Sequence, residues 1–231
     1  MKRIGIAMAL GLALASGNSN AAVVFNDGDF STWSFGSFAT GGSATMSREA
    51  TGGNPGARLN VTTVTASLAE SAFGTGIKTD YSTTAALAGT GFTLTLDVLS
   101  GAGAFGQGQG LNLLVEQGGS VYALALGITN VQAAFTTLAF SGTLNAASFT
   151  LVAGGGPAQP DFSGGTTTRF GFAAGNTNSA TLTQYYDNVR LDLAAVVAQG
   201  PGVPIPLMSS IGLLALIATL GVAGLARVRR R

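Results

Sequence analysis

The chain lacks two residue types on which many protein functions depend. Its 231 residues include no cysteine and no histidine. Without cysteine it cannot form disulfides or thiolate metal sites, and without histidine it has neither the commonest general base nor the commonest metal ligand. The glutamates are Glu49, Glu70 and Glu116, and no motif pairs two carboxylates for glycoside hydrolysis. We therefore expect a protein that is not an enzyme.

Charged residues are also scarce, at 9% of the chain, and the formal net charge is +1. Six of the eleven basic residues lie at the two ends of the chain. The segment between them carries five basic residues against all ten carboxylates, which is a net charge of −5. Nucleic-acid binding needs clustered lysine and arginine to displace the counterions of the phosphates. The charge distribution therefore excludes a nucleic-acid partner.

Glycine is abundant, with 35 residues, and short apolar runs alternate with polar residues between the glycines. Residues 92–98 are the clearest case, because Phe92, Leu94, Leu96 and Val98 fall on one face of a strand. This pattern predicts an all-β fold, an antiparallel β-sandwich of the jelly-roll type, over residues 23–195. Similar runs occupy residues 57–64, 111–116, 121–128, 134–140, 148–152, 168–172 and 181–193.

The N-terminus has the three parts of a secretory signal. Lys2 and Arg3 form a positive region, residues 4–15 an apolar region, and small residues precede Ala22. The apolar run is shorter than the roughly 20 residues that a membrane span needs. We therefore predict that residues 1–22 are a signal peptide, which signal peptidase removes during export.

The C-terminus predicts a transmembrane helix over residues 207–228, which contain no charge before Arg227 and are long enough to cross a bilayer. A linker of residues 196–206 precedes this helix, and a basic tail of residues 229–231 follows it. Basic clusters stay on the cytoplasmic side, so the β-domain is expected to face outward. The basic stop consists of Arg227, Arg229, Arg230 and Arg231.

The order of these C-terminal parts carries a resemblance. Val203, Pro204, Ile205 and Pro206, followed by an apolar helix and terminal arginines, resemble the tail of the PEP-CTERM class of sorting signals, especially its Val-Pro-Leu-Pro-type variants. The resemblance implies export through the inner membrane and processing by an exosortase-type transpeptidase. It also implies a final place on the cell surface or in the extracellular matrix, associated with exopolysaccharide or biofilm.

Both ends of the β-domain carry a second resemblance. The runs DGDFSTW (27–33) and YYDNVRL (185–191) resemble the first and last strands of jelly-roll carbohydrate-binding modules and related lectin-like sandwiches. Alternation places Asp187 on the core side of the last strand and Tyr186 on its outer side. The resemblance implies a structural Ca²⁺ held by Asp187 together with Asp27 and Asp29. The alternative is an Asp187 satisfied by backbone amides or by solvent.

Aromatic residues are the candidates for stacking on sugar rings, with Trp33 and Tyr186 foremost. Their alternative role is to fill or rim the core. Two functions stay open: a non-catalytic, sorted surface or matrix protein, and a carbohydrate-binding module that recognises a defined glycan. A concave face or loop rim with exposed Trp33 or tyrosines would favour the second function, and buried or scattered aromatics the first. The other aromatic candidates are Tyr81, Tyr122 and Tyr185.

Overall fold

The computed structural model describes residues 22–101, 103 and 108–194. The signal segment up to residue 21, the sorting motif, the 207–228 segment and the basic tail lie outside the described residues. Within the described part of the chain, no helix is long and apolar enough to cross a membrane.

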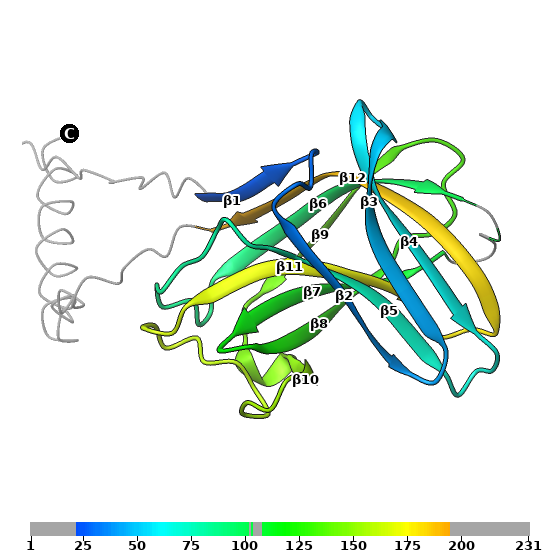
Figure 1. Cartoon of the computed structure of the whole chain (residues 1–231). Coiled ribbons are helices and arrows are strands. Elements are labelled where there is room, and N and C mark those ends of the chain that lie inside the picture. Colours follow the sequence, from blue (N-terminus) through cyan, green and yellow to red (C-terminus); the bar gives the residue numbers. More distant parts are fainter. Residues whose placement is uncertain (1–21, 102, 104–107, 195–231) are drawn as a thin grey trace, which may run out of the picture. The chain divides into compact units, whose positions relative to one another are not determined.

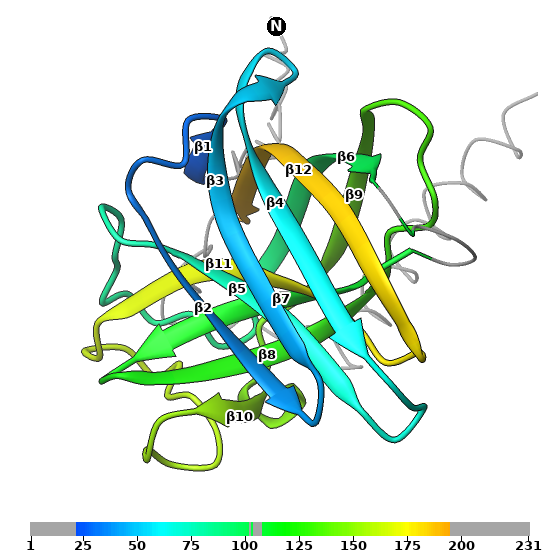
Figure 2. The ribbon, with the colours of Figure 1, turned by 45° about the vertical axis from the view of Figure 1, so that its right-hand side comes forward.

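The described residues form two antiparallel sheets, each of six strands, packed face to face (Figure 1, Figure 2). The expected all-β antiparallel sandwich is therefore confirmed. A short 3₁₀-helix, Ala146–Ser148, precedes β10. Sheet A has the order β3 (Ser43–Gly53), β4 (Gly56–Thr65), β12 (Ala180–Leu193), β6 (Gly91–Ser100) and β9 (Thr136–Thr143), with β1 (Ala22–Asp27) paired on β12. Sheet B has the order β10 (Thr150–Ala153), β8 (Ser120–Ile128), β7 (Gly110–Gln117), β11 (Thr168–Asn176), β5 (Ser71–Lys78) and β2 (Trp33–Thr40).

The core lies between the sheets and follows the alternation of the sequence. On β6 the four apolar positions from Phe92 to Val98 are all buried, as the pattern predicted. Sheet B contributes Trp33 and Phe172, whose rings meet edge-on with centroids 5.9 Å apart. Phe172 in turn packs against Tyr186 of sheet A at 5.4 Å. This aromatic chain joins the two sheets at the centre of the domain.

A β-bulge interrupts the last strand and reverses its alternation. Asn188 has a φ of 48°, and the register between β12 and β6 shifts between Asp187 and Arg190. Before the bulge Tyr186 faces the core, and after it Val189 does. The expectation that Tyr186 faces outward is therefore wrong, because the extra residue changes which side chains point inward. The buried Tyr186 hydroxyl donates to Oε1 of Gln109 at 2.9 Å.

Candidate functional site

The outer face of sheet B is hollowed along β11. On this strand Phe170 and Phe172 belong to the core, so the alternating positions Gly171, Ala173 and Gly175 face outward. The middle of the face is therefore lower than its two sides. The outward positions of the flanking strands carry larger side chains, namely Phe73, Thr75 and Ile77 on β5 and Asn112, Leu114 and Glu116 on β7.

Apolar residues line this hollow and form a cluster separate from the core. Leu114 and Ala173 have no exposed surface, although they face away from the sandwich interior. Side chains on an open, flat sheet face would remain accessible to water. Their burial shows that the neighbouring side chains rise above them on both sides. The cluster also contains Ile77 and Ala123, with Phe38, Phe73, Val121 and Val152 packed around it.

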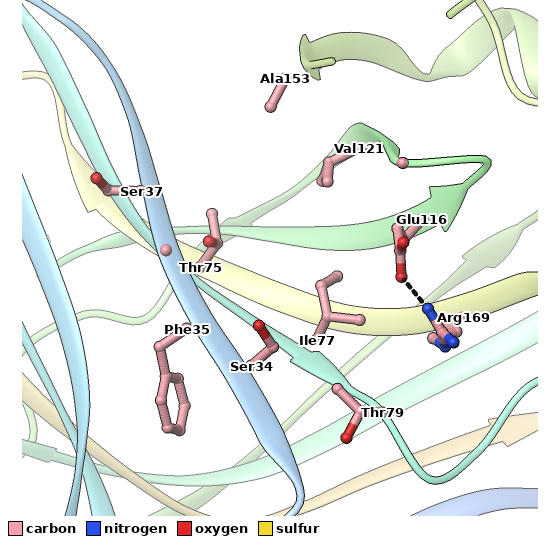
Figure 3. A pocket seen from close by; sticks show the side chains of 12 residues that line it. Ser34, Phe35, Ser37, Thr75, Ile77, Thr79, Glu116, Val121, Ala153 and Arg169 are labelled. Atoms are coloured by element: carbon pink, nitrogen blue, oxygen red, sulfur yellow. Dashed lines mark hydrogen bonds and ion pairs between the residues drawn. The ribbon is translucent and has the colours of Figure 1, made fainter.

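A depression of about 360 Å³ lies over one end of this face (Figure 3). Hydroxyl-bearing side chains on β2, on β5 and directly after β5 line one side of it, and the floor includes Ile77 and Val121. An apolar floor with a few polar groups at its edge is typical of ligand-binding sites. The hydroxyl groups belong to Ser34, Ser37, Thr75 and Thr79.

An ion pair closes the other side of the depression. Glu116 of β7 and Arg169 of β11 are directly opposite each other in the sheet, and Nη1 of Arg169 donates to Oε2 of Glu116 at 3.0 Å. Among the described residues that line the depression, Glu116 is the one carboxylate. Glycoside hydrolysis usually needs two carboxyl groups on either side of the scissile bond. The described lining of the depression therefore holds one of the two carboxyl groups that this reaction usually uses.

The aromatic residues singled out in the sequence do not line this face. Trp33 is 7% exposed and packs in the core, where its Nε1 donates to Oδ2 of Asp27 at 3.0 Å. Tyr122 and Tyr186 are also buried. The expectation that Trp33 and Tyr186 stack on a glycan is therefore wrong, because neither ring offers a face to solvent. Tyr185 lies on sheet A under the Arg58 guanidinium, which is 3.5 Å from the ring centroid.

Sequence reasoning missed the aromatic pair that does lie on the hollowed face. Phe38 of β2 and Phe73 of β5 are opposite each other in the sheet, and their rings stack with centroids 5.0 Å apart and planes 15° apart. Both are partly exposed. Their signal in the sequence was weak, because phenylalanine at an alternating position is most simply placed in the core.

The three aspartates predicted to bind calcium are not brought together. The carboxylate of Asp27 accepts from Nζ of Lys78 at 2.5 Å, and Asp29 pairs with Arg48 at 2.6 Å. Within the described residues, no three acidic side chains gather as a metal site would require. The prediction that Asp27, Asp29 and Asp187 bind one Ca²⁺ together is therefore wrong, because Asp27 and Asp29 each form an ion pair with a basic side chain.

Asp187 instead faces a second carboxylate that the sequence did not single out. Asp97 of β6 lies opposite it in the sheet, and both are buried. Neither carboxylate has an ionic partner among the described residues. Burial raises the pKa of Asp187, the nearby Asp97 charge adds to this rise, and backbone amides of Asn54 and Asn188 oppose it. The predicted contact of Asp187 with backbone amides is present, but its predicted core-side position is wrong. Asp97 alternates with the core residues Leu96 and Val98, so Asp97 and its partner Asp187 lie on the outer face of sheet A.

The comparisons with known proteins found similar structures only. No protein-family model matches the sequence, and no curated protein matches it. The function must therefore be argued from the side chains of this chain. A family 11 carbohydrate-binding module from Clostridium thermocellum, solved with a β-1,3-1,4-mixed-linked tetrasaccharide, is 15% identical with a TM-score of 0.44, over 74% of this chain and 96% of that one. The CBM22-1 xylan-binding domain of Paenibacillus barcinonensis Xyn10C is 13% identical with a TM-score of 0.43, over 75% and 96%.

Proposed function

We propose that this protein is a non-catalytic carbohydrate-binding module that recognises a glycan on the outer face of sheet B. The observation that carries the proposal is the 360 Å³ depression. Its apolar floor suits the C–H face of a sugar ring, and its edge of hydroxyl groups suits the sugar hydroxyls. Glu116, the one carboxylate among the described residues that line it, forms an ion pair with Arg169, which supports binding without hydrolysis.

Of the two functions that the sequence leaves open, recognition of a defined glycan is the one that the described residues support. The criterion of an exposed Trp33 or exposed tyrosines on this face is not met, because Trp33, Tyr122 and Tyr186 are buried. The face instead offers the partly exposed rings of Phe38 and Phe73. Export, processing by an exosortase-type transpeptidase and a role in biofilm matrix rest on residues outside the described part of the chain. They remain predictions, and they are compatible with a domain that binds polysaccharide outside the cell.

Filling the depression should abolish binding. Thr75 lines it and lies on the central part of the face, so the substitution Thr75→Arg would place a long, charged side chain over the apolar floor. We expect the full chain to bind at least one polysaccharide in a glycan array, and the variant to lose at least tenfold in affinity. A tenfold loss corresponds to about 1.4 kcal/mol.

Thr95→Arg is the matched control. Thr95 is a half-exposed threonine on β6 of sheet A, so the same change adds the same charge on the opposite sheet. Its affinity should equal that of the unmodified chain. Equal losses in the two variants would show that added charge, and not the depression, controls binding.

We also propose that a structural Ca²⁺ binds at the Asp97–Asp187 pair, in place of the set expected from the sequence. Two buried carboxylates without a basic partner are costly, and a cation would neutralise them. The Nδ2 groups of Asn54 and Asn188 donate to Oδ2 of Asp97. Oδ1 of Asn188 lies beside Oδ1 of Asp187, since a Cβ at Gly28 would be close to both atoms, and Ca²⁺ prefers carboxylate and amide oxygens as ligands. Gly28 leaves the space open, since a Cβ there would lie 3.3 Å from Oδ1 of Asp187.

Calcium should therefore raise the melting temperature of the full chain, and a chelator should lower it. A ligand at 100 times its dissociation constant stabilises the folded state by about 2.7 kcal/mol. The variant Asp97→Asn should lose the response to calcium. Without calcium it should be at least as stable as the unmodified chain, because one of two like charges is gone. A melting curve that neither calcium nor chelator changes would contradict the calcium site. It would not bear on the proposed glycan site.

A further inference from the structure

The stacked pair of Phe38 and Phe73 is fixed in place on the outer face of sheet B. A Cβ at Gly175 would lie 2.3 Å from Cδ1 of Phe73, so the Phe73 ring occupies space that only a glycine leaves free. Phe38 then stacks on Phe73 from the neighbouring strand. Two partly exposed aromatic rings, held at one position on an open face, offer apolar surface to a ligand.

The aromatic pair and the Glu116–Arg169 pair mark the two ends of one hollowed face. Phe73 is opposite Gly175 of β11, and Glu116 is opposite Arg169 of the same strand. The two β11 positions are six residues apart, which is about 20 Å along a strand. The depression lies between them and includes Gly36 and Thr75, the pair of residues next to the aromatic rings. A face of this length can contact several linked sugar rings.

The charges of the domain decide which class of glycan fits. All five basic residues of the described domain are held in ion pairs, and carboxylates outnumber them by ten to five. No described lysine or arginine is therefore left without an acidic partner to receive a uronate or sulfate group. An anionic chain would meet net repulsion. The ion pairs are Arg48–Asp29, Arg58–Glu49, Lys78–Asp27, Lys78–Asp80, Arg169–Glu116 and Arg190–Asp192.

We propose that the ligand of this face is an extended, uncharged polysaccharide chain that stacks a sugar ring on the Phe38–Phe73 pair. This inference rests on the proposed function and adds the class of glycan and the stacking residues. The chain runs from the aromatic pair along the depression toward Glu116 and Arg169. Hydroxyl groups of Ser34 and Thr75 face its sugar hydroxyls.

The test is affinity electrophoresis of the full chain in gels that contain a soluble polysaccharide. The neutral probes are mixed-linked β-glucan, xylan and galactomannan, and the anionic probes are alginate and polygalacturonate. We expect retardation by at least one neutral probe and at least tenfold weaker binding of the anionic ones. Phe73→Leu keeps an apolar side chain but removes the ring, and should weaken neutral binding about three- to tenfold. Phe73→Tyr keeps the ring and should retain the affinity.

Tyr185→Leu is the control, because it removes a partly exposed ring from the outer face of sheet A and should leave binding unchanged. Phe38→Leu, on the edge strand, gives a second measurement should Phe73→Leu not fold. Neutral binding that Thr75→Arg abolishes but both leucine variants retain would overturn the stacking inference and keep the proposed function. Preference for an anionic probe would overturn the assigned class. Binding of no polysaccharide, or a dimer that Phe73→Leu dissociates in sedimentation, would overturn both proposals.

Discussion

Asp27→Asn is expected to lower the free energy of unfolding by about 3 kcal/mol. The side chains of Asp27 and Lys78 are only 10% and 11% exposed, and their charged atoms are 2.5 Å apart. The same carboxylate accepts from Nε1 of Trp33 at 3.0 Å and from the amide of Phe30 at 2.9 Å. Asparagine has one acceptor oxygen and no charge, so it leaves the Lys78 ammonium with the Thr32 hydroxyl and with the more exposed Asp80 as its one described ionic partner. Denaturant unfolding would measure the change.

The contribution of Asp27 to the free energy of unfolding should also depend on pH. Burial alone would raise the pKa of Asp27, but the hydrogen bonds from Lys78, Trp33 and two backbone amides outweigh it and lower the pKa from 3.8 to about 2. A carboxyl group with a lowered pKa stabilises the folded state above its unfolded pKa and loses this contribution as pH falls. The loss should therefore occur between about pH 4 and pH 2, and it should be absent from Asp27→Asn.

Asp29→Asn is the matched control. Asp29 lies two residues away and also pairs with a basic side chain, but its own side chain is 63% exposed. Exposed ion pairs contribute little to stability, so this variant should unfold at the same denaturant concentration as the unmodified chain. Equal destabilisation by the two variants would contradict the role assigned to the buried Asp27–Lys78 pair.

The fold could be predicted because its signal is local. Alternation over a few residues shows which side chains face the core, as residues 92–98 illustrate, and one apolar side chain in every two requires a second layer to cover it. The alternation failed where the backbone departed from regular geometry. The bulge at Asn188 rotates the strand, and one sequence offers only the tolerance of asparagine for positive φ as a hint.

The side-chain clusters, including the hollowed face of sheet B, were predicted poorly because their residues come together only through strand order. Asp97 lies opposite Asp187 across 90 residues of chain, and Lys78 reaches Asp27 across 51. Which strands neighbour each other cannot be read from alternation. The three aspartates were grouped by a resemblance at the two ends of the domain, and the pairing of Asp27 with Lys78 was not visible there.

Trp33→Ala is expected to have the other large effect, about 4 kcal/mol of lost stability. The indole packs edge-on against Phe25 and Phe30, with centroids 5.5 Å and 5.7 Å away. Gly76 leaves room for it, since a Cβ there would lie 2.9 Å from the ring. Removing the ring would open a cavity between the sheets and free one lone pair of the buried Asp27 carboxylate.

This effect separates a core residue from a sugar-stacking one. A platform residue would lose glycan affinity on truncation while the domain kept its stability, whereas a core residue should do the opposite. We expect Trp33→Ala, measured below its lowered melting temperature, to bind the same polysaccharide with unchanged affinity. Because Trp33 donates to Asp27, the double variant with Asp27→Asn should cost less than the two single variants together. Full additivity would show that the indole and the carboxylate act independently, and a selective loss of affinity would return Trp33 to the binding site.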